Sequence, residues 1–263
     1  YVSKERIELE FEKMLLKSET PSLGLRWLLE INRLQDIFPE LYKTVGVKQE
    51  YKWHPEKDVF EHTMQALDAA AKLEYKHEQE KLILLYAAIC HDLGKPDATR
   101  VINGVIKSYG HEIVGVEIAK KLLKRITSKK DLIDTVLKLV RHHMSPGTFA
   151  KQNAGLGAYK RLAIRLSPET NIEMLTKLAF SDRRGRNGEA NVPLDTPQPE
   201  IELFLTRAKE AQVLFEKEHP VLLGRDFINV FSKGPDLGEA VKLAYKLQID
   251  ESIRDKEALK QLV

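Results

Sequence analysis

Residues 84–96, LLYAAICHDLGKP, decide how the rest of the chain is interpreted. The run from 84 to 90 is apolar and indicates a helix that lies in a core. His91 and Asp92 follow it without a spacer, and a buried imidazole and carboxylate are costly unless other groups pair with them. This stretch therefore predicts a polar centre at the inner end of a buried helix.

The composition is that of a soluble globular protein. The chain has 263 residues, of which 43% are hydrophobic and 31% charged, and its formal charge of +3 says little about nucleic acid. Its single cysteine, Cys90, excludes an internal disulfide and favours a cytoplasmic location. No apolar run is long enough to span a membrane, and no signal-peptide pattern opens the chain. The first residue is Tyr rather than Met, which fits a segment of a longer polypeptide.

Apolar residues recur at helical spacing along most of the chain, so the sequence predicts an all-α fold. Residues 97–110 are β-branched around an Asn-Gly pair, which indicates a small hairpin or an irregular loop. Residues 187–200 are rich in Pro, Gly and Asn and have the composition of a linker. The predicted helices cover residues 3–17, 22–35, 57–74, 78–93, 111–126, 130–144, 155–166, 169–180, 200–217 and 237–248, with a short one near the C-terminus.

The placement of histidine and aspartate carries the functional signal. His62 shares a predicted helix face with Ala66 and Ala69, small residues that leave space beside the imidazole. His143 falls on the apolar stripe of its helix and points inward, whereas His142 points to the side. The candidate metal ligands, all at helix ends or on inner faces, are His62, His91, Asp92, His111, His143 and Asp182.

Imidazole with carboxylate is a ligand set of Mn, Fe, Ni, Zn or Mg rather than of a thiolate site. A lone His-Asp pair is a weak motif, but the ordered set H…HD…H…H…D is a strong one. The remaining histidines have simpler explanations. His77 lies in a charged surface stretch, His219 precedes a proline in a loop, and His54 shapes the turn before the next helix.

This H…HD…D pattern resembles the HD superfamily of metal-dependent phosphohydrolases. The resemblance is narrower over four stretches, which are similar to the HD domain attached to bacterial tRNA nucleotidyltransferases, the CCA-adding enzymes. These stretches are HPEKDVFEHTMQAL at 54–67, HDLGKP at 91–96, GHEIVGVEIAKKL at 110–122 and SDRRGR at 181–186. Residues outside them resemble the neck and the C-terminal tRNA-binding body of the same enzymes, so that the resemblance covers nearly the whole chain.

The resemblance implies three parts: a helical neck over residues 1–50, an HD phosphohydrolase domain over 51–190, and a C-terminal helical, RNA-binding-like region over 191–263. The polymerising head of the family carries a Gly-Gly phosphate-binding loop and a D-x-D pair of carboxylates. Neither pattern occurs in this chain. We therefore expect that it does not add CCA alone, and that a nucleotidyltransferase head is a partner on the same or a separate chain.

For the metal centre, the resemblance implies divalent ions, and the number of histidines favours two. Asp92 is central in the motif order and is the candidate bridging ligand. His62, His91 and Asp182 would complete one position, and His111 with His143 the other. Two ions that share a carboxylate favour attack of water on phosphorus.

Cations near this motif are candidates for holding a substrate phosphate. Lys95 lies three residues after Asp92 and is a candidate catalytic and substrate-binding residue, although a cation that complements a helix dipole is the alternative. Arg184 and Arg186 match the R-G-R of the family, and their alternative is a solvated charge run. Basic residues at 120–125, 160–165 and 183–186 would contact RNA phosphates without reading sequence.

Two functions from different classes follow. The first is an enzyme that hydrolyses phosphate esters at nucleotides or tRNA 3′ ends; the resemblance implies 2′,3′-cyclic phosphodiesterase, 2′-nucleotidase and phosphatase activities. The second is an RNA-binding body whose HD site is structural or vestigial. A nucleoside monophosphatase is the nearest competitor among enzymes. A cyclic-dinucleotide phosphodiesterase is disfavoured, because the chain has no Gly-Tyr-Pro motif.

Overall fold

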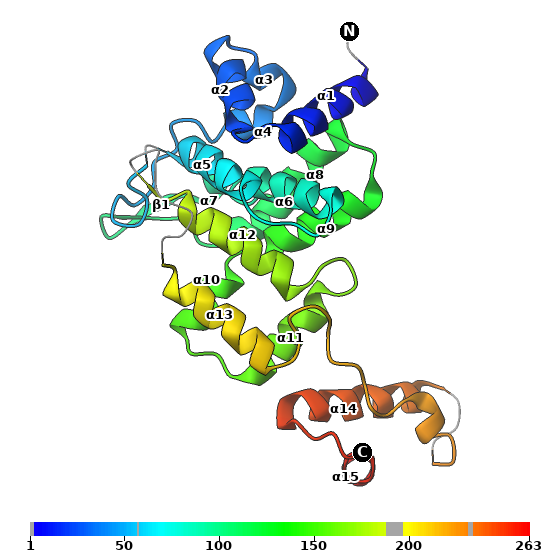
Figure 1. Cartoon of the computed structure of the whole chain (residues 1–263). Coiled ribbons are helices and arrows are strands. Elements are labelled where there is room, and N and C mark those ends of the chain that lie inside the picture. The colour runs from blue at the N-terminus through cyan, green and yellow to red at the C-terminus, as the bar shows by residue number, and fades with distance from the viewer. Residues whose placement is uncertain (1–2, 57, 188–196, 231–233) are drawn as a thin grey trace.

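The computed structural model describes residues 3–56, 58–187, 197–230 and 234–263. Nearly all of its elements are helices, which confirms the predicted all-α fold (Figure 1). The N-terminal helices are α1 (Lys4–Lys17), α2 (Ser22–Glu30), α3 (Leu34–Ile37) and α4 (Pro39–Tyr42). The central elements are α5 (Val59–Ala71), α6 (Glu78–Cys90), α7 (Lys95–Ala98), β1 (Arg100–Ile102), β2 (Val105–Lys107), α8 (His111–Ile126), α9 (Lys130–His142), α10 (Ser145–Lys151), α11 (Leu156–Leu166) and α12 (Ile172–Arg184). The C-terminal elements are α13 (Pro199–Glu210), η1 (Gly224–Asp226), α14 (Pro235–Glu251) and α15 (Lys256–Gln261).

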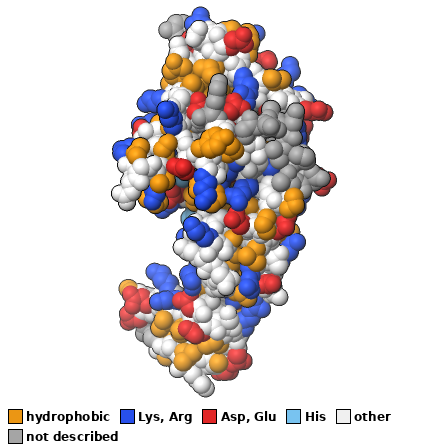
Figure 2. Space-filling view, turned by 90° about the vertical axis from the view of Figure 1, so that its left-hand side faces the viewer, with side chains coloured by type: hydrophobic (Ala, Val, Ile, Leu, Met, Phe, Trp, Pro, Cys, Tyr) orange, Lys and Arg blue, Asp and Glu red, His pale blue; other side chains and the backbone are white. Residues whose placement is uncertain are grey.

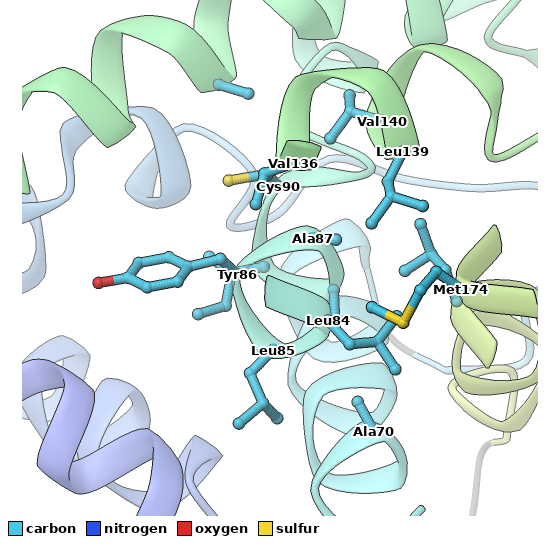
Figure 3. Close-up of a cluster of buried hydrophobic side chains, with 14 of the residues drawn as sticks. Ala70, Leu84, Leu85, Tyr86, Ala87, Cys90, Val136, Leu139, Val140 and Met174 are labelled. Atoms are coloured by element: carbon cyan, nitrogen blue, oxygen red, sulfur yellow. The ribbon is translucent and has the colours of Figure 1, made fainter. Parts of the chain in front are cut away.

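Helix α6 lies in the middle of the bundle because, from Leu82 to its end, its side chains are apolar on every side. Leu84, Tyr86 and Cys90 are fully buried and leave the helix in different directions (Figure 3). Helices α1, α5, α9 and α12 all pack against it. The end of α6 that leads into His91 is therefore enclosed by other elements of the chain.

The N-terminal helices belong to the same core. Phe11 of α1 contacts the ring of Tyr86 with the ring centroids 5.7 Å apart, and Arg26 of α2 makes a two-pronged ion pair with Glu61 of α5. One hydrophobic cluster runs from α1 to the residues after α13. The predicted domain boundaries near residues 50 and 190 stay predictions, and residue 190 lies outside the described residues.

Several predicted boundaries differ from the structure for local reasons. The helix predicted over 22–35 ends at Glu30, because Asn32 adopts a left-handed conformation with φ 58°. The helix predicted over 169–180 extends to Arg184, so that Asp182 lies in its last turn rather than after it. The helix predicted over 200–217 ends at Glu210, where Gln212 is left-handed with φ 59°. Of the predicted linker, residues 188–196 lie outside the described part of the chain.

The stretch predicted as a hairpin or a loop is a hairpin. Strands β1 and β2 pair antiparallel, with Ile102 opposite Val105. The turn residues Asn103 and Gly104 have φ of 52° and 76°, the left-handed values that a two-residue hairpin turn requires.

The C-terminal helices form a second, smaller cluster. Leu222, Phe227, Ala244 and Leu259 pack together apart from the main core. Helices α14 and α15 lie at one end of the molecule, where α14 packs against α11 and α15 against α14 (Figure 1). None of the helices in the described residues is both long and apolar enough to cross a membrane.

Candidate metal centre

Four histidines and two aspartates meet inside the bundle, and all six were predicted from the sequence. Their ligand atoms form two groups that share Asp92: one with His62 and His91, the other with His111 and His143. Asp182 joins the first group, because its Oδ1 lies 3.1 Å from His62 Nε2. All six side chains are between 0% and 8% exposed as whole residues.

Each side chain is delivered by the end or the inner face of a helix. His62 lies on the buried face of α5, and His91 caps the C-terminus of α6. His111 is the first residue of α8, and His143 caps the C-terminus of α9. With Asp182 of α12, five helices contribute side chains to the centre, the number that the sequence predicted.

Two glycines permit the close approaches that bring these ends together. A Cβ on Gly94 would lie 2.1 Å from the carbonyl oxygen of His111, so glycine lets the turn after Asp92 contact the start of α8. A Cβ on Gly185 would lie 2.9 Å from the amide nitrogen of Ala66. The space predicted beside His62 at Ala66 is therefore filled by the backbone at the end of α12.

The four histidines of the centre share one hydrogen-bond pattern. Each Nδ1 lies within hydrogen-bonding distance of a backbone carbonyl oxygen, so that the Nδ1–H donates and Nε2 faces the centre. The pairs are His62 with Gly185 at 2.9 Å, His91 with Ala88 at 2.8 Å, His111 with Ser108 at 2.7 Å and His143 with Val140 at 2.7 Å.

This arrangement fits a divalent cation. The Nε2 atoms of His62 and His91 lie 3.2 Å apart, and those of His111 and His143 lie 3.0 Å apart. With each Nδ1–H donating, two Nε2 lone pairs at these distances would repel, so a positive charge belongs between them: a proton on one ring of the pair, or a bound cation that replaces it. Two nitrogens bound at right angles to an ion, with bonds of about 2.1 Å, are themselves roughly 3 Å apart.

Asp92 faces both histidine pairs with different oxygens. Its Oδ2 lies 3.4 Å from His62 Nε2 and 3.3 Å from His91 Nε2. Its Oδ1 lies 3.2 Å from His111 Nε2. A carboxylate placed in this way has one oxygen for each of two neighbouring cation positions.

The centre combines ionised carboxylates with histidines whose pKa values are shifted in opposite directions. Burial opposes ionisation of Asp92, but His91 and Lys95 outweigh it and hold the pKa of this carboxyl well below its usual range. Burial also opposes the charged form of His62, yet its hydrogen bonds with Asp182 and Glu56 raise the pKa of His62 to about 9. Burial and the neighbouring rings lower the pKa of His143 to about 3. The centre thus holds its carboxylates as anions; a bound ion would find His143 already neutral and would displace a proton from His62.

The loop before α5 contributes residues that the sequence analysis missed. Glu56 Oε1 lies 2.9 Å from His62 Nδ1 and 2.7 Å from His54 Nδ1. His54 is thus part of the surroundings of the centre and does more than shape a turn. The Oε1 of Gln49 accepts a hydrogen bond of 2.6 Å from Lys95 Nζ. The only available signal was that WHPEKD carries a glutamate two residues from a histidine.

The other predicted residues occupy different positions. Lys95 is buried, and its Nζ lies 2.7 Å from Asp92 Oδ2. The guanidinium of Arg186 binds both carboxylate oxygens of Asp182, at 2.9 and 2.7 Å. Arg184 lies over the ring of Phe180 instead. His142 is half-buried beside Arg165 and is absent from the described ligand groups.

An all-helical bundle with this ordered centre is what an HD domain provides, and residues 59–179 match the HD domain family. The chain therefore contains an HD domain over these residues. It is also homologous to the C-terminal part of proteins named multifunctional CCA protein.

Two such relatives show the extent of the similarity. The protein from Pasteurella multocida (strain Pm70) is 34% identical over 199 residues, which are 75% of this chain and 46% of the relative. The protein from Halorhodospira halophila (strain DSM 244 / SL1) is 30% identical over 249 residues, 91% of this chain and 53% of the relative. The chain thus spans about half the length of these relatives.

Proposed function

We propose that the chain is a metal-dependent phosphohydrolase that acts on 2′,3′-cyclic and 2′-phosphates of nucleotides or of tRNA 3′ ends. The observation that carries the proposal is the position of Asp92, whose two oxygens face two separate histidine pairs. The HD domain and the similarity to CCA proteins support a phosphate ester of RNA as the substrate.

The residues would hold two divalent ions, of Mn, Ni, Mg, Fe or Zn. His62, His91 and Asp182 would bind one and His111 with His143 the other, and Asp92 would serve as a ligand to both. Ions in such a centre supply Lewis-acid chemistry, which polarises phosphoryl oxygens and favours ionisation of water near neutral pH.

The protein supplies orientation and charge around these ligands. The carbonyl oxygens that bind each Nδ1 fix the rings, which raises the basicity of Nε2. Arg186 orients Asp182 through three hydrogen bonds. Lys95 lies beside Asp92 with its ammonium 2.7 Å from the carboxylate, where it would also attract a substrate phosphate.

A cyclic phosphate suits these groups for a chemical reason. The five-membered 2′,3′ ring is strained, and its opening needs no strong acid at the leaving oxygen. Lys95 is the ammonium that would sit near the phosphate, so it contributes one charge-assisted contact. We therefore expect Asp92→Ala to abolish hydrolysis and Lys95→Ala only to reduce it.

The test is elemental analysis of the purified chain after mild metal loading, followed by hydrolysis of 2′,3′-cyclic, 2′- and 3′-nucleotides. Bound divalent metal, with hydrolysis that excess chelator stops, would support the proposal. A loaded chain that hydrolyses none of the panel would instead favour the RNA-binding body with a vestigial site.

We also propose that tRNA is a partner of the chain, because the relatives are named CCA proteins. Binding should weaken clearly as salt rises, since the contacts would be to phosphates. A binding curve that stays the same between low and moderate salt would contradict these contacts.

A further inference from the structure

A hollow of about 310 Å³ lies beside the candidate metal centre. Its lining comes from the loop before α5, from the end of α12 and from the residues just before α13. Figure 2 shows lysine and arginine side chains next to apolar ones on one face of the molecule. The residues that line it are Lys52, Trp53, Pro55, Arg183, Arg184, Arg186, Asn187, Pro197 and Gln198.

This lining combines cations with a flat aromatic surface. It includes three arginines and a lysine, of which Arg183 pairs with Glu200 at 2.6 Å and Arg186 with Asp182 at 2.7 Å. The indole of Trp53 is 56% exposed, with Lys52 Nζ 5.0 Å from its centroid. An exposed indole among cations is the surface on which single-stranded nucleic acid stacks its bases.

The hollow also offers a polar atom that lacks a partner. Gln198 is only 5% exposed, and in the described part of the chain its Oε1 has no hydrogen-bond partner. A buried amide oxygen without a donor is costly, so a ligand that brings an N–H would be favoured there. Nucleobases carry such donors on their edges; the hydroxyls of a sugar can donate as well, so ribose 5-phosphate is the ligand that separates the two.

Two residues connect the hollow with the metal centre. Arg186 lines the hollow and binds Asp182, whose Oδ1 is 3.1 Å from His62 Nε2. Pro55 also lines it, and the next residue, Glu56, contacts His62. A nucleotide with its phosphate at the centre could therefore reach the hollow with its base.

We propose that this hollow is the base-binding subsite of the HD centre, with Trp53 as the stacking platform and the arginines beside the adjoining phosphate. The ligand is a nucleoside phosphate, either a free nucleotide or the last nucleotide of an RNA. This inference rests on the proposed function for the place of the phosphate. It adds that the substrate is recognised by its base.

Fluorescence can test the subsite without hydrolysis, because the chain has two tryptophans. Trp27, in the N-terminal part, is 58% exposed and serves as the matched control for Trp53. The Trp27→Phe protein, in which Trp53 alone emits, is titrated with adenosine 3′-monophosphate, ribose 5-phosphate and inorganic phosphate in the presence of chelator. A short RNA is the second source of the same ligand. We expect quenching by the nucleotide and the RNA only, and none in the Trp53→Phe protein.

Equilibrium dialysis with the nucleotide completes the test. Trp53→Ala should weaken binding about tenfold, the loss that removal of one base-stacking aromatic causes, while Trp27→Ala leaves it unchanged. Equal binding of ribose 5-phosphate, or unchanged binding by Trp53→Ala, would overturn the subsite. Base-dependent quenching in a metal-loaded chain that hydrolyses nothing would keep the subsite and reject the proposed reaction. Hydrolysis by Trp53→Ala with the KM of the wild type would keep the proposed reaction and reject the subsite.

Discussion

At the scale of single residues, the direction of each hydrogen bond decides which atoms face the candidate metal centre. His143 donates its Nδ1–H to Val140 and directs Nε2 toward His111, whereas His142, one residue earlier, lies beside the cations Arg141 and Arg165. Neighbours in sequence therefore have separate roles, and the difference follows from the position of the last turn of α9 against the core.

His143→Ala should lower metal affinity and hydrolysis by at least about 100-fold. Removing an outer partner of a ligand typically costs about 10–100-fold in affinity, and removing the ligand itself should cost more. His142→Ala should leave both nearly unchanged. Metal analysis and initial rates of the two variants measure the difference. The opposite ranking would show that His142 is the ligand.

Glu56→Gln should lower the metal affinity by about 10–100-fold, the range typical of a carboxylate that orients a ligating histidine. The substitution keeps the size of the side chain but removes the charge 2.9 Å from His62 Nδ1. Competition with a metal-sensitive dye measures the affinity. Glu50→Gln is the control, because Glu50 accepts a hydrogen bond from Ile106 of the hairpin instead; equal losses in both variants would argue against the role of Glu56.

The sequence predicted the six ligand candidates because helix ends and inner faces follow from periodicity. Glu56 and Gln49 were missed because they lie in a loop, whose path depends on the helices around it. Arg186 was predicted as a substrate contact from its motif. Its ion pair with Asp182 needed the structure, since that pair depends on α12 continuing through Arg184.

At the scale of elements, close helix packing places the ligands. The turn after Asp92 touches the start of α8, where the space for a side chain at Gly94 is taken by the backbone of His111 and Gly115. Periodicity predicted the long helices but not this contact. It also missed α10, whose sequence SPGTFAK contains both proline and glycine.

Gly94→Ala should destabilise the protein by about 1–3 kcal/mol, the usual cost of overpacking, because its Cβ would meet backbone atoms that cannot rotate away. It should also weaken metal binding, since His111 lies at the contact. Gly147→Ala is the matched control, because its Cβ would meet nothing within 4 Å in α10. Thermal unfolding of both variants measures the difference. An equal Tm for Gly94→Ala and wild type would contradict the packing argument.

At the scale of the whole molecule, the C-terminal helices are joined to the main bundle by a polar cluster around Glu218. This carboxylate lies 3.0 Å from Lys160 Nζ of α11 and accepts hydrogen bonds from Gln248 of α14 and from Arg254. The two hydrophobic clusters are separate. The position of α14 and α15 against the bundle therefore depends strongly on these charged contacts.

The attachment of α14 should weaken in acid. Burial raises the pKa of Glu218, but hydrogen bonds from Gln248, Arg254 and Lys160 outweigh it and leave the pKa below its ordinary value. A carboxyl whose pKa is lowered by folding stabilises the contact fully above its ordinary pKa, and this contribution is lost as the pH falls through the lowered value.

Hydrogen exchange of the α14 amides, compared between neutral and acidic pH, should report this loss. Glu218→Gln should open α14 about tenfold more often at neutral pH, as expected when a charge-assisted hydrogen bond becomes a neutral one, and should remove the acid dependence. Glu216→Gln, at a side chain that is 78% exposed, should change neither. Protection of α14 that is the same in wild type and Glu218→Gln would show that apolar contacts alone hold the C-terminal helices in place.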